Sequence, residues 1–105
     1  EFAEAVKSLK PVTEKQPNWN FAVYALGVAY RKSGDIKNAA AAFRRAVEKD
    51  PNYVAAWSGL GESEFRNERP EETKKVIEKL KKINAVGEAR KLEVLMMGAK
   101  LKSGY

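Results

Sequence analysis

The side chains best suited to acid–base chemistry in this sequence are carboxylates, because the chain contains no histidine and no cysteine. A Ser-His-Asp triad, a Cys-His pair and a His or Cys zinc site are therefore excluded within it. Carboxylate pairs remain, including Glu62 with Glu64 and Glu71 with Glu72. Residues one or two apart on a helix point in different directions, and solvated positions do not activate a carboxylate. We expect both pairs to serve solubility, and we predict no catalytic residue, no metal site and no enzyme activity for this segment.

Glycines raise the question of phosphate binding, and four of them lie in the first two thirds of the chain: Gly27, Gly34, Gly59 and Gly61. A phosphate-binding loop needs a glycine-rich turn followed by a GK pair, and no GxxxxGK sequence is present. Gly59 and Gly61 fall instead within an amphipathic helical pattern. Close packing of helices is the simpler explanation, so we predict no cofactor.

The net charge is +6, from 20 Lys and Arg against 14 Asp and Glu, which could favour an acidic partner. The most basic segment, residues 70–84, carries its acids early and its lysines late, as the helix dipole prefers. This order indicates a solvated helix face rather than a binding patch, and we regard a nucleic acid as an unlikely partner.

Length and hydropathy place the chain among small globular domains or short repeat arrays. It has 105 residues, of which 44% are hydrophobic, enough for a core. Its apolar runs fall short of the roughly 18 to 20 residues that a membrane span needs, so none is expected. No secretory signal is visible. The compartment stays open: cytoplasm is slightly favoured, and the periplasm is an alternative if a signal was removed.

An internal repeat organises the sequence. PNWNFAVYALGVAY at residues 17–30 is matched 34 positions later by PNYVAAWSGLGESE at residues 51–64. The match pairs prolines, asparagines, aromatics and small residues at one offset: Pro17 with Pro51, Asn18 with Asn52, Trp19 with Tyr53, Ala22 with Ala56, Leu26 with Leu60, and Gly27 with Gly61.

Apolar residues spaced by three and four predict amphipathic helices throughout. We expect helices over residues 2–15, 20–32, 36–49, 54–67, 70–84 and 87–101. Pro11 should end or kink the first helix, Pro70 suits a first helical position, and Gly87 marks an interruption. Ser103 and Gly104 should end the last helix.

The repeat resembles the tetratricopeptide repeat family, whose 34-residue helix-turn-helix unit has a recognisable signature. The family's signature residues correspond to Leu26, Gly27, Tyr30, Gly34, Ala39, Phe43, Ala46 and Pro51. The resemblance implies an all-α, right-handed solenoid of antiparallel helix pairs forming one domain over residues 1–105. Two full repeats, 20–53 and 54–87, would be flanked by the second helix of a partial repeat, 1–19, and by a capping helix and tail, 88–105.

The second repeat departs from the family pattern at three positions. Glu64 stands for the expected Tyr, Thr73 for Ala and Ala85 for Pro, which leaves the exit from this repeat undetermined. At the amino end, Phe2 and Leu9 align with Ile36 and Phe43, so the chain is expected to begin within a repeat.

If the family geometry carries over, certain positions of the first helices face an inner groove. The partner-binding candidates are Phe21, Tyr24, Val28, Arg31, Ala55, Ser58, Glu62, Phe65, Leu92 and Met96. Tyr24 and Phe65 are the predicted anchors, with packing between helices as the alternative reading. Val23, Leu26, Trp57 and Leu60 are assigned to the core. The carboxylate clamp of one family branch is not matched, because Tyr24, Val28 and Gly59 replace its Lys and Asn residues.

The resemblance implies a non-catalytic adaptor that binds a peptide segment or partner helix, with Arg31, Lys32 and Arg66 helping to select acidic segments. One alternative is self-association through the incomplete edge that carries Phe2, Ala5, Val6 and Leu9. A second is RNA binding by a basic solenoid, although no base-reading code is evident. Sedimentation would separate the first two readings.

Overall fold

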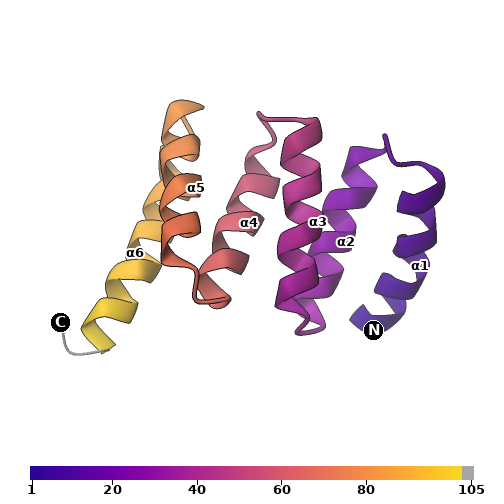
Figure 1. The fold of residues 1–105 in the computed structure, drawn as a ribbon, viewed down its shortest axis with the longest axis horizontal. Helices are drawn as coiled ribbons and strands as arrows, with labels where there is room; N and C mark the ends of the chain where they lie inside the picture. Colours follow the sequence, from indigo (N-terminus) through magenta and orange to yellow (C-terminus); the bar gives the residue numbers. More distant parts are fainter. Residues whose placement is uncertain (103–105) are drawn as a thin grey trace.

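The computed structural model describes residues 1–102, and these residues form six α-helices and no β-strand (Figure 1). The helices are α1 (Phe2–Lys15), α2 (Asn20–Lys32), α3 (Ile36–Lys49), α4 (Val54–Arg66), α5 (Pro70–Lys82) and α6 (Val86–Lys102). The expected all-α class is confirmed, and α1, α2 and α3 match their predicted ranges. The helices α4 and α5 end slightly earlier than predicted. The predicted chain end at residues 103–105 lies outside the described residues.

Consecutive helices pack side by side in one row, as Figure 1 shows. The row measures 46 × 28 × 18 Å along its principal axes. α4 also contacts α2 and α6, while α1 packs against α2 alone among the described helices. This elongated stack is a helical solenoid; its right-handed sense and the limits of its repeats stay predictions. No helix within residues 1–102 is long and apolar enough to cross a membrane.

The core centres on Phe43, which is fully buried between α2 and α4. A Cβ added to Gly27 would lie 2.8 Å from the Phe43 ring, and one added to Gly59 would lie 2.7 Å from it. Two helical glycines therefore make room for one aromatic ring. The close packing expected at Gly27 is present, and its physical cause is the volume of Phe43.

Three of the five turns share a single geometry. In each, the residue after the helix cap has a positive φ, of 91° at Gly34, 59° at Glu68 and 64° at Asn84. The next backbone N–H donates to a carbonyl five residues back, which is the Schellman pattern. These bonds join Asp35 to Tyr30 at 2.9 Å, Arg69 to Glu64 at 2.9 Å, and Ala85 to Leu80 at 2.8 Å.

The other two turns, between α1 and α2 and between α3 and α4, contain Pro17 and Pro51. There the first N–H after the helix donates to a carbonyl four residues back, from Gln16 to Val12 and from Asp50 to Ala46. The sequence left open which turn Ala85 would make. The structure shows that α5 and α6 are joined by the Schellman turn, not by a copy of the proline turn.

Pro11 lies inside α1, which runs to Lys15 as the predicted range has it, and the expected kink stays a prediction. Two local expectations need correction. Gly87 does not interrupt the chain, because it lies in the first turn of α6. Trp57, assigned to the core, is only half-buried: its indole N–H donates to the Pro51 carbonyl at 2.7 Å.

Candidate functional site

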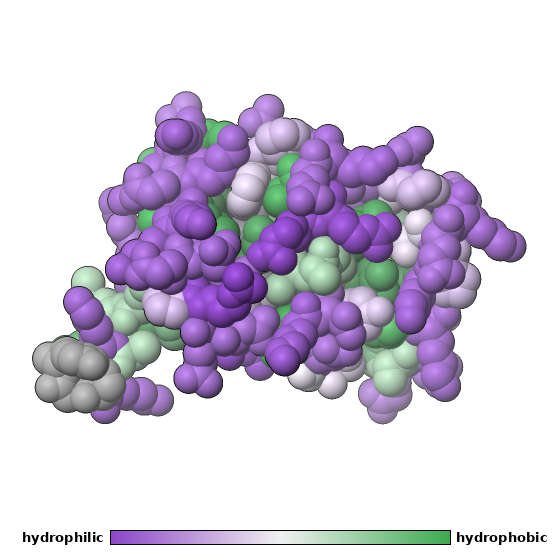
Figure 2. Space-filling model, in the orientation of Figure 1, coloured by the Kyte–Doolittle hydropathy of each residue, from purple (hydrophilic) through white to green (hydrophobic). Residues whose placement is uncertain are grey.

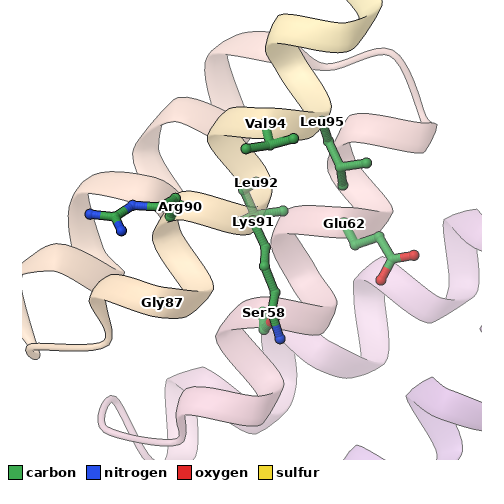
Figure 3. A pocket seen from close by; sticks show the side chains of 8 residues that line it. All are labelled: Ser58, Glu62, Gly87, Arg90, Lys91, Leu92, Val94 and Leu95. Atoms are coloured by element: carbon green, nitrogen blue, oxygen red, sulfur yellow. The ribbon is translucent and has the colours of Figure 1, made fainter.

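The helices α2, α4 and α6 lie next to one another on one side of the row and form a shared surface, here called the α2–α4–α6 face. A cavity of about 500 Å³ opens on this face between α4 and α6. Its lining residues come from the middle of α4 and the first half of α6: Ser58, Glu62, Gly87, Arg90, Lys91, Leu92, Val94 and Leu95 (Figure 3).

Apolar side chains of α6 dominate the wall of this cavity. Leu92 is 2% exposed and forms its floor, while Val94 and Leu95 are exposed at its rim. In Figure 3 the Lys91 side chain extends from α6 toward Ser58, whereas Arg90 points away from the cavity. The site thus combines an apolar floor with a hydroxyl and an ammonium group, the mixture that positions a ligand segment.

An ion pair closes the cavity on the α2 side. The Arg31 guanidinium lies 3.4 Å from the Glu62 carboxylate and so joins α2 to α4. The same guanidinium carbon lies 5.9 Å from the centroid of the Phe43 ring. Arg31 is therefore held by its own chain, which argues against its expected role of selecting an acidic ligand.

Aromatic rings continue the α2–α4–α6 face toward the amino end of α2. The Tyr24 ring lies 5.2 Å from Tyr53 and 5.7 Å from Phe43, measured between centroids. Burial, together with nearby Tyr24 and Asp50, raises the pKa of the Tyr53 hydroxyl. Tyr24 is thus engaged in packing between helices, the alternative reading of this residue. Phe21, at 62% exposed, is the ring that faces solvent.

The structure separates the predicted anchors. Phe65 and Met96 do not reach the cavity between α4 and α6. They line a larger one of about 920 Å³, bounded by the end of α4, the start of α5 and the second half of α6. Tyr24 lines neither cavity. The expected pairing of Tyr24 with Phe65 in one groove is therefore not seen.

The remaining candidates differ in accessibility. Ser58 and Glu62 line the smaller cavity, and Ala55 is exposed on α4. Val28 is half-buried and packs against the core. Leu92 was expected in the groove, yet its side chain is buried because it packs over Gly61, where an added Cβ would collide with it. Leu92 can offer a partner only the floor of the cavity.

Sequence reasoning missed Lys91, Val94 and Leu95, which complete the cavity wall. Asn84 is the residue from which the start of α6 could have been predicted. Asparagine tolerates a positive φ after a helix, so a Schellman turn at residues 83–85 would have placed the start of α6 at Val86. Counting helical turns from Val86 then puts these three side chains near α4.

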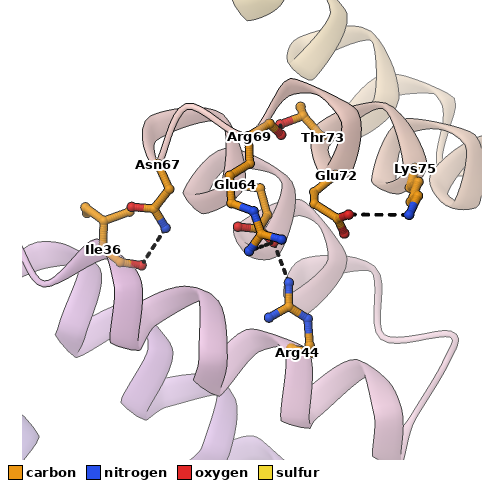
Figure 4. A network of polar contacts seen from close by, with 8 residues as sticks. All are labelled: Ile36, Arg44, Glu64, Asn67, Arg69, Glu72, Thr73 and Lys75. Atoms are coloured by element: carbon orange, nitrogen blue, oxygen red, sulfur yellow. Dashed lines mark hydrogen bonds and ion pairs between the residues drawn. The ribbon is translucent and has the colours of Figure 1, made fainter.

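Glu64 was expected to be solvated, and this expectation is wrong: it is 1% exposed. Its Oε2 accepts a hydrogen bond from Arg44 of α3 and lies 3.5 Å from Arg69, which follows α4 (Figure 4). Burying a carboxylate requires such charge partners. The three residues, here called the Glu64 cluster, tie α3, α4 and the start of α5 together.

Thr73, which replaces the expected Ala in the second repeat, is also fully buried. Its hydroxyl donates to the Arg69 carbonyl at 3.0 Å, so its polar group is satisfied within its own helix. Across residues 1–102, no group of three or more Asp and Glu side chains is arranged to hold a metal ion.

Comparison with known proteins gives three matches. A model of the tetratricopeptide repeat family matches residues 24–72. Tetratricopeptide repeat protein 37 of Xenopus laevis is 29% identical over 85 residues, covering 74% of this chain and 5% of that protein. A TPR repeat-containing protein of Pseudomonas aeruginosa is 42% identical over 40 residues, covering 38% of this chain and 38% of that protein. The matched part of this chain thus spans 5% of the length of the first relative and 38% of the second.

Tetratricopeptide repeats generally mediate protein–protein interactions, and the family consists typically of non-catalytic scaffolds. The matched segment runs from α2 into α5 and contains the 34-residue repeat that the sequence displays. Both relatives carry the repeat in their names. The family match over residues 24–72, the repeat spacing and the all-helical fold together support the tetratricopeptide repeat family for this chain.

Proposed function

We propose that this chain is a non-catalytic adaptor whose α2–α4–α6 face binds a peptide segment or helix of another protein. The observation that carries the proposal is the cavity of about 500 Å³ between α4 and α6. Leu92 at its floor and Val94 and Leu95 at its rim would accept apolar side chains of the partner. Lys91 and Ser58 would donate hydrogen bonds that set the orientation of the bound segment.

Phe21 supplies a second contact on the same face. Its ring is largely exposed and lies 6.4 Å from the Tyr24 ring, which supports it from beneath. A rigid, supported aromatic ring is an effective anchor because little conformational freedom is lost on binding. A segment lying across α2, α4 and α6 would contact both Phe21 and the cavity.

Self-association through the amino-terminal edge is the second candidate function. It is favoured by α1, which has α2 as its single helical neighbour among the described elements, and by Phe2, which is half-exposed. Part of this edge already makes a contact within the chain, because the Lys32 ammonium lies 5.3 Å from the centroid of the Phe2 ring. Sedimentation of the Phe2→Ser variant tests this candidate, because loss of a dimer would support the edge and a monomeric parent chain would exclude it.

The groove is tested by capturing a partner with this chain, mapping hydrogen exchange, and measuring affinity by calorimetry. Protection should fall on α4 and α6. Ser58→Tyr fills the cavity and Leu95→Ser removes an apolar contact, so each should weaken binding by about 1–3 kcal/mol. Lys82→Ala, on the exposed side of α5, is the control and should bind normally. Normal binding by both groove variants would refute the proposal.

A further inference from the structure

We propose that the exposed side of α6 docks an acidic amphipathic helix from another protein. This site shares Gly87, Arg90 and Val94 with the rim of the α4–α6 cavity and extends past that cavity to Met97 and Leu101. Ala89 and Leu92 are buried where α6 packs on α4 and α5. On the other side of α6, residues recur at intervals of three and four, the spacing of a helix–helix seam. This outer stripe consists of Gly87, Arg90, Val94, Met97 and Leu101.

The outer stripe is apolar and exposed. Val94, Met97 and Leu101 are 60%, 61% and 71% exposed. Figure 2 shows green surface at the lower left, where Figure 1 places the second half of α6. An exposed apolar face of this kind marks a contact surface.

Glycines on the same side of α6 support a close helix contact. Glycine is a poor helix former. In the core, Gly27 and Gly59 are explained by the Phe43 ring that packs against each of them. Gly87 and Gly98 lie in α6 three helical turns apart, and an added Cβ would meet no atom within 4 Å at either position. A docked helix could place bulky side chains over them as Phe43 does in the core.

The charges beside the stripe select the occupant. Arg90 and Lys91 form no ion pair with any residue in the described range 1–102. Glu93, in contrast, forms an ion pair with Lys81 at 3.0 Å. A second copy of α6 packed in parallel would oppose Arg90 to Arg90. A helix with glutamate or aspartate beside its apolar seam complements these cations.

The test uses two synthetic helical peptides that share a leucine seam with three- and four-residue spacing. One carries glutamates beside the seam, and the other carries lysines at the same positions. Fluorescence anisotropy with the chain should show binding of the glutamate peptide, weakened by salt, and at least about tenfold weaker binding of the lysine peptide. Equal binding of the two peptides, or binding of neither, would overturn the proposal.

Variants locate the site. Met97→Ser and Arg90→Glu should each weaken binding of the glutamate peptide by about tenfold or more. Arg45→Glu makes the same charge change on the exposed side of α3 and should leave binding unchanged. Ser58→Tyr, which fills the α4–α6 cavity, should also leave it unchanged, so failure of the groove proposal is distinguishable from failure of this one. Circular dichroism checks that each variant is folded.

Two further results would overturn the proposal. Normal binding by both Met97→Ser and Arg90→Glu would place the peptide elsewhere on the chain. Self-association of the chain in sedimentation that Met97→Ser abolishes would assign the stripe to a second copy instead of an acidic partner.

Discussion

The two consecutive helix hairpins, α2–α3 and α4–α5, use the same position in opposite ways. Tyr30 in α2 is half-buried against the core, and Glu64, 34 residues later in α4, is almost completely buried. Glu64 is tolerated because two guanidinium groups reach it. The comparison teaches that the repeat preserves the burial of a position, while partners from other helices decide which chemistry can occupy it.

The exits of the two hairpins differ as well. Four residues, 50–53, join α3 to α4, and three residues, 83–85, join α5 to α6. The shorter Schellman turn sets where α6 begins and therefore which of its side chains face α4. The apolar stripe of α6 consequently points outward. Among the described residues, the exit turn thus distinguishes a repeat that leads into a helix pair from one that leads into α6.

The largest expected effect tests what the two hairpins share. Phe43 belongs to the first hairpin yet fills the space beside Gly27 and Gly59 in both. Phe43→Ala should lower the free energy of unfolding by about 3–5 kcal/mol, because it leaves a cavity between α2 and α4. Urea unfolding measures the loss. The exposed ring of Phe21 is the control, and Phe21→Ala should cost less than about 1 kcal/mol. Equal losses would show that Phe43 is not the shared centre.

The second prediction exchanges the chemistry of the two hairpins. Tyr30→Glu should destabilise the chain by about 2–4 kcal/mol, because it puts a carboxylate against the core without the two arginines. The residues 34 positions before Arg44 and Arg69 are Lys10 and Asp35, and Asp35 repels the new charge.

The reverse exchange, Glu64→Tyr, should change the free energy of unfolding by no more than about 1 kcal/mol in either direction, because apolar replacement of a buried ion pair is often neutral. Thermal and urea unfolding of both variants provide the measurement. If Tyr30→Glu proved as harmless as Glu64→Tyr, local partners would not decide which residue the position accepts.

The third prediction compares glycines with and without a packed neighbour. Gly27→Leu should cost about 1–3 kcal/mol, because the new side chain meets the Phe43 ring and forces α2 and α3 apart. Gly98→Leu is the matched control in open space and should be neutral or stabilising by up to about 1 kcal/mol. Urea midpoints of the two variants distinguish them. A loss of stability at Gly98 would mean that α6 is packed on its outer side.

The smallest expected effect concerns the Schellman turns. Glu68 has a φ of 59° where the first hairpin has Gly34. Glu68→Gly should raise the free energy of unfolding by about 0.5–1 kcal/mol, because glycine adopts this backbone conformation without steric cost. The matched change in the first hairpin, Gly34→Ala, should lower it by about 1 kcal/mol. Thermal melts should shift in opposite directions, and parallel shifts would contradict the equivalence of the two turns.

Much of the architecture follows from the sequence by itself. The three- and four-residue spacing of apolar residues predicted six helices, and the 34-residue offset identified the helix pairs. Gly27 and Phe43 could be assigned to close packing because helices in contact need small residues opposite large ones. These features depend on neighbours in the chain or on a fixed repeat length, so a single sequence is sufficient to reveal them.

Only the tertiary structure decided which polar and apolar groups are accessible. Nothing near Glu64 in the sequence shows that Arg44, 20 residues away on another helix, reaches its carboxylate. Leu92 resembled a groove residue until its contact with Gly61 was seen. The exposure of the α6 side chains likewise depends on the direction in which the turn at Asn84 sets that helix. Burial and charge pairing arise from side chains that distant helices bring together, and periodicity along one helix carries no record of them.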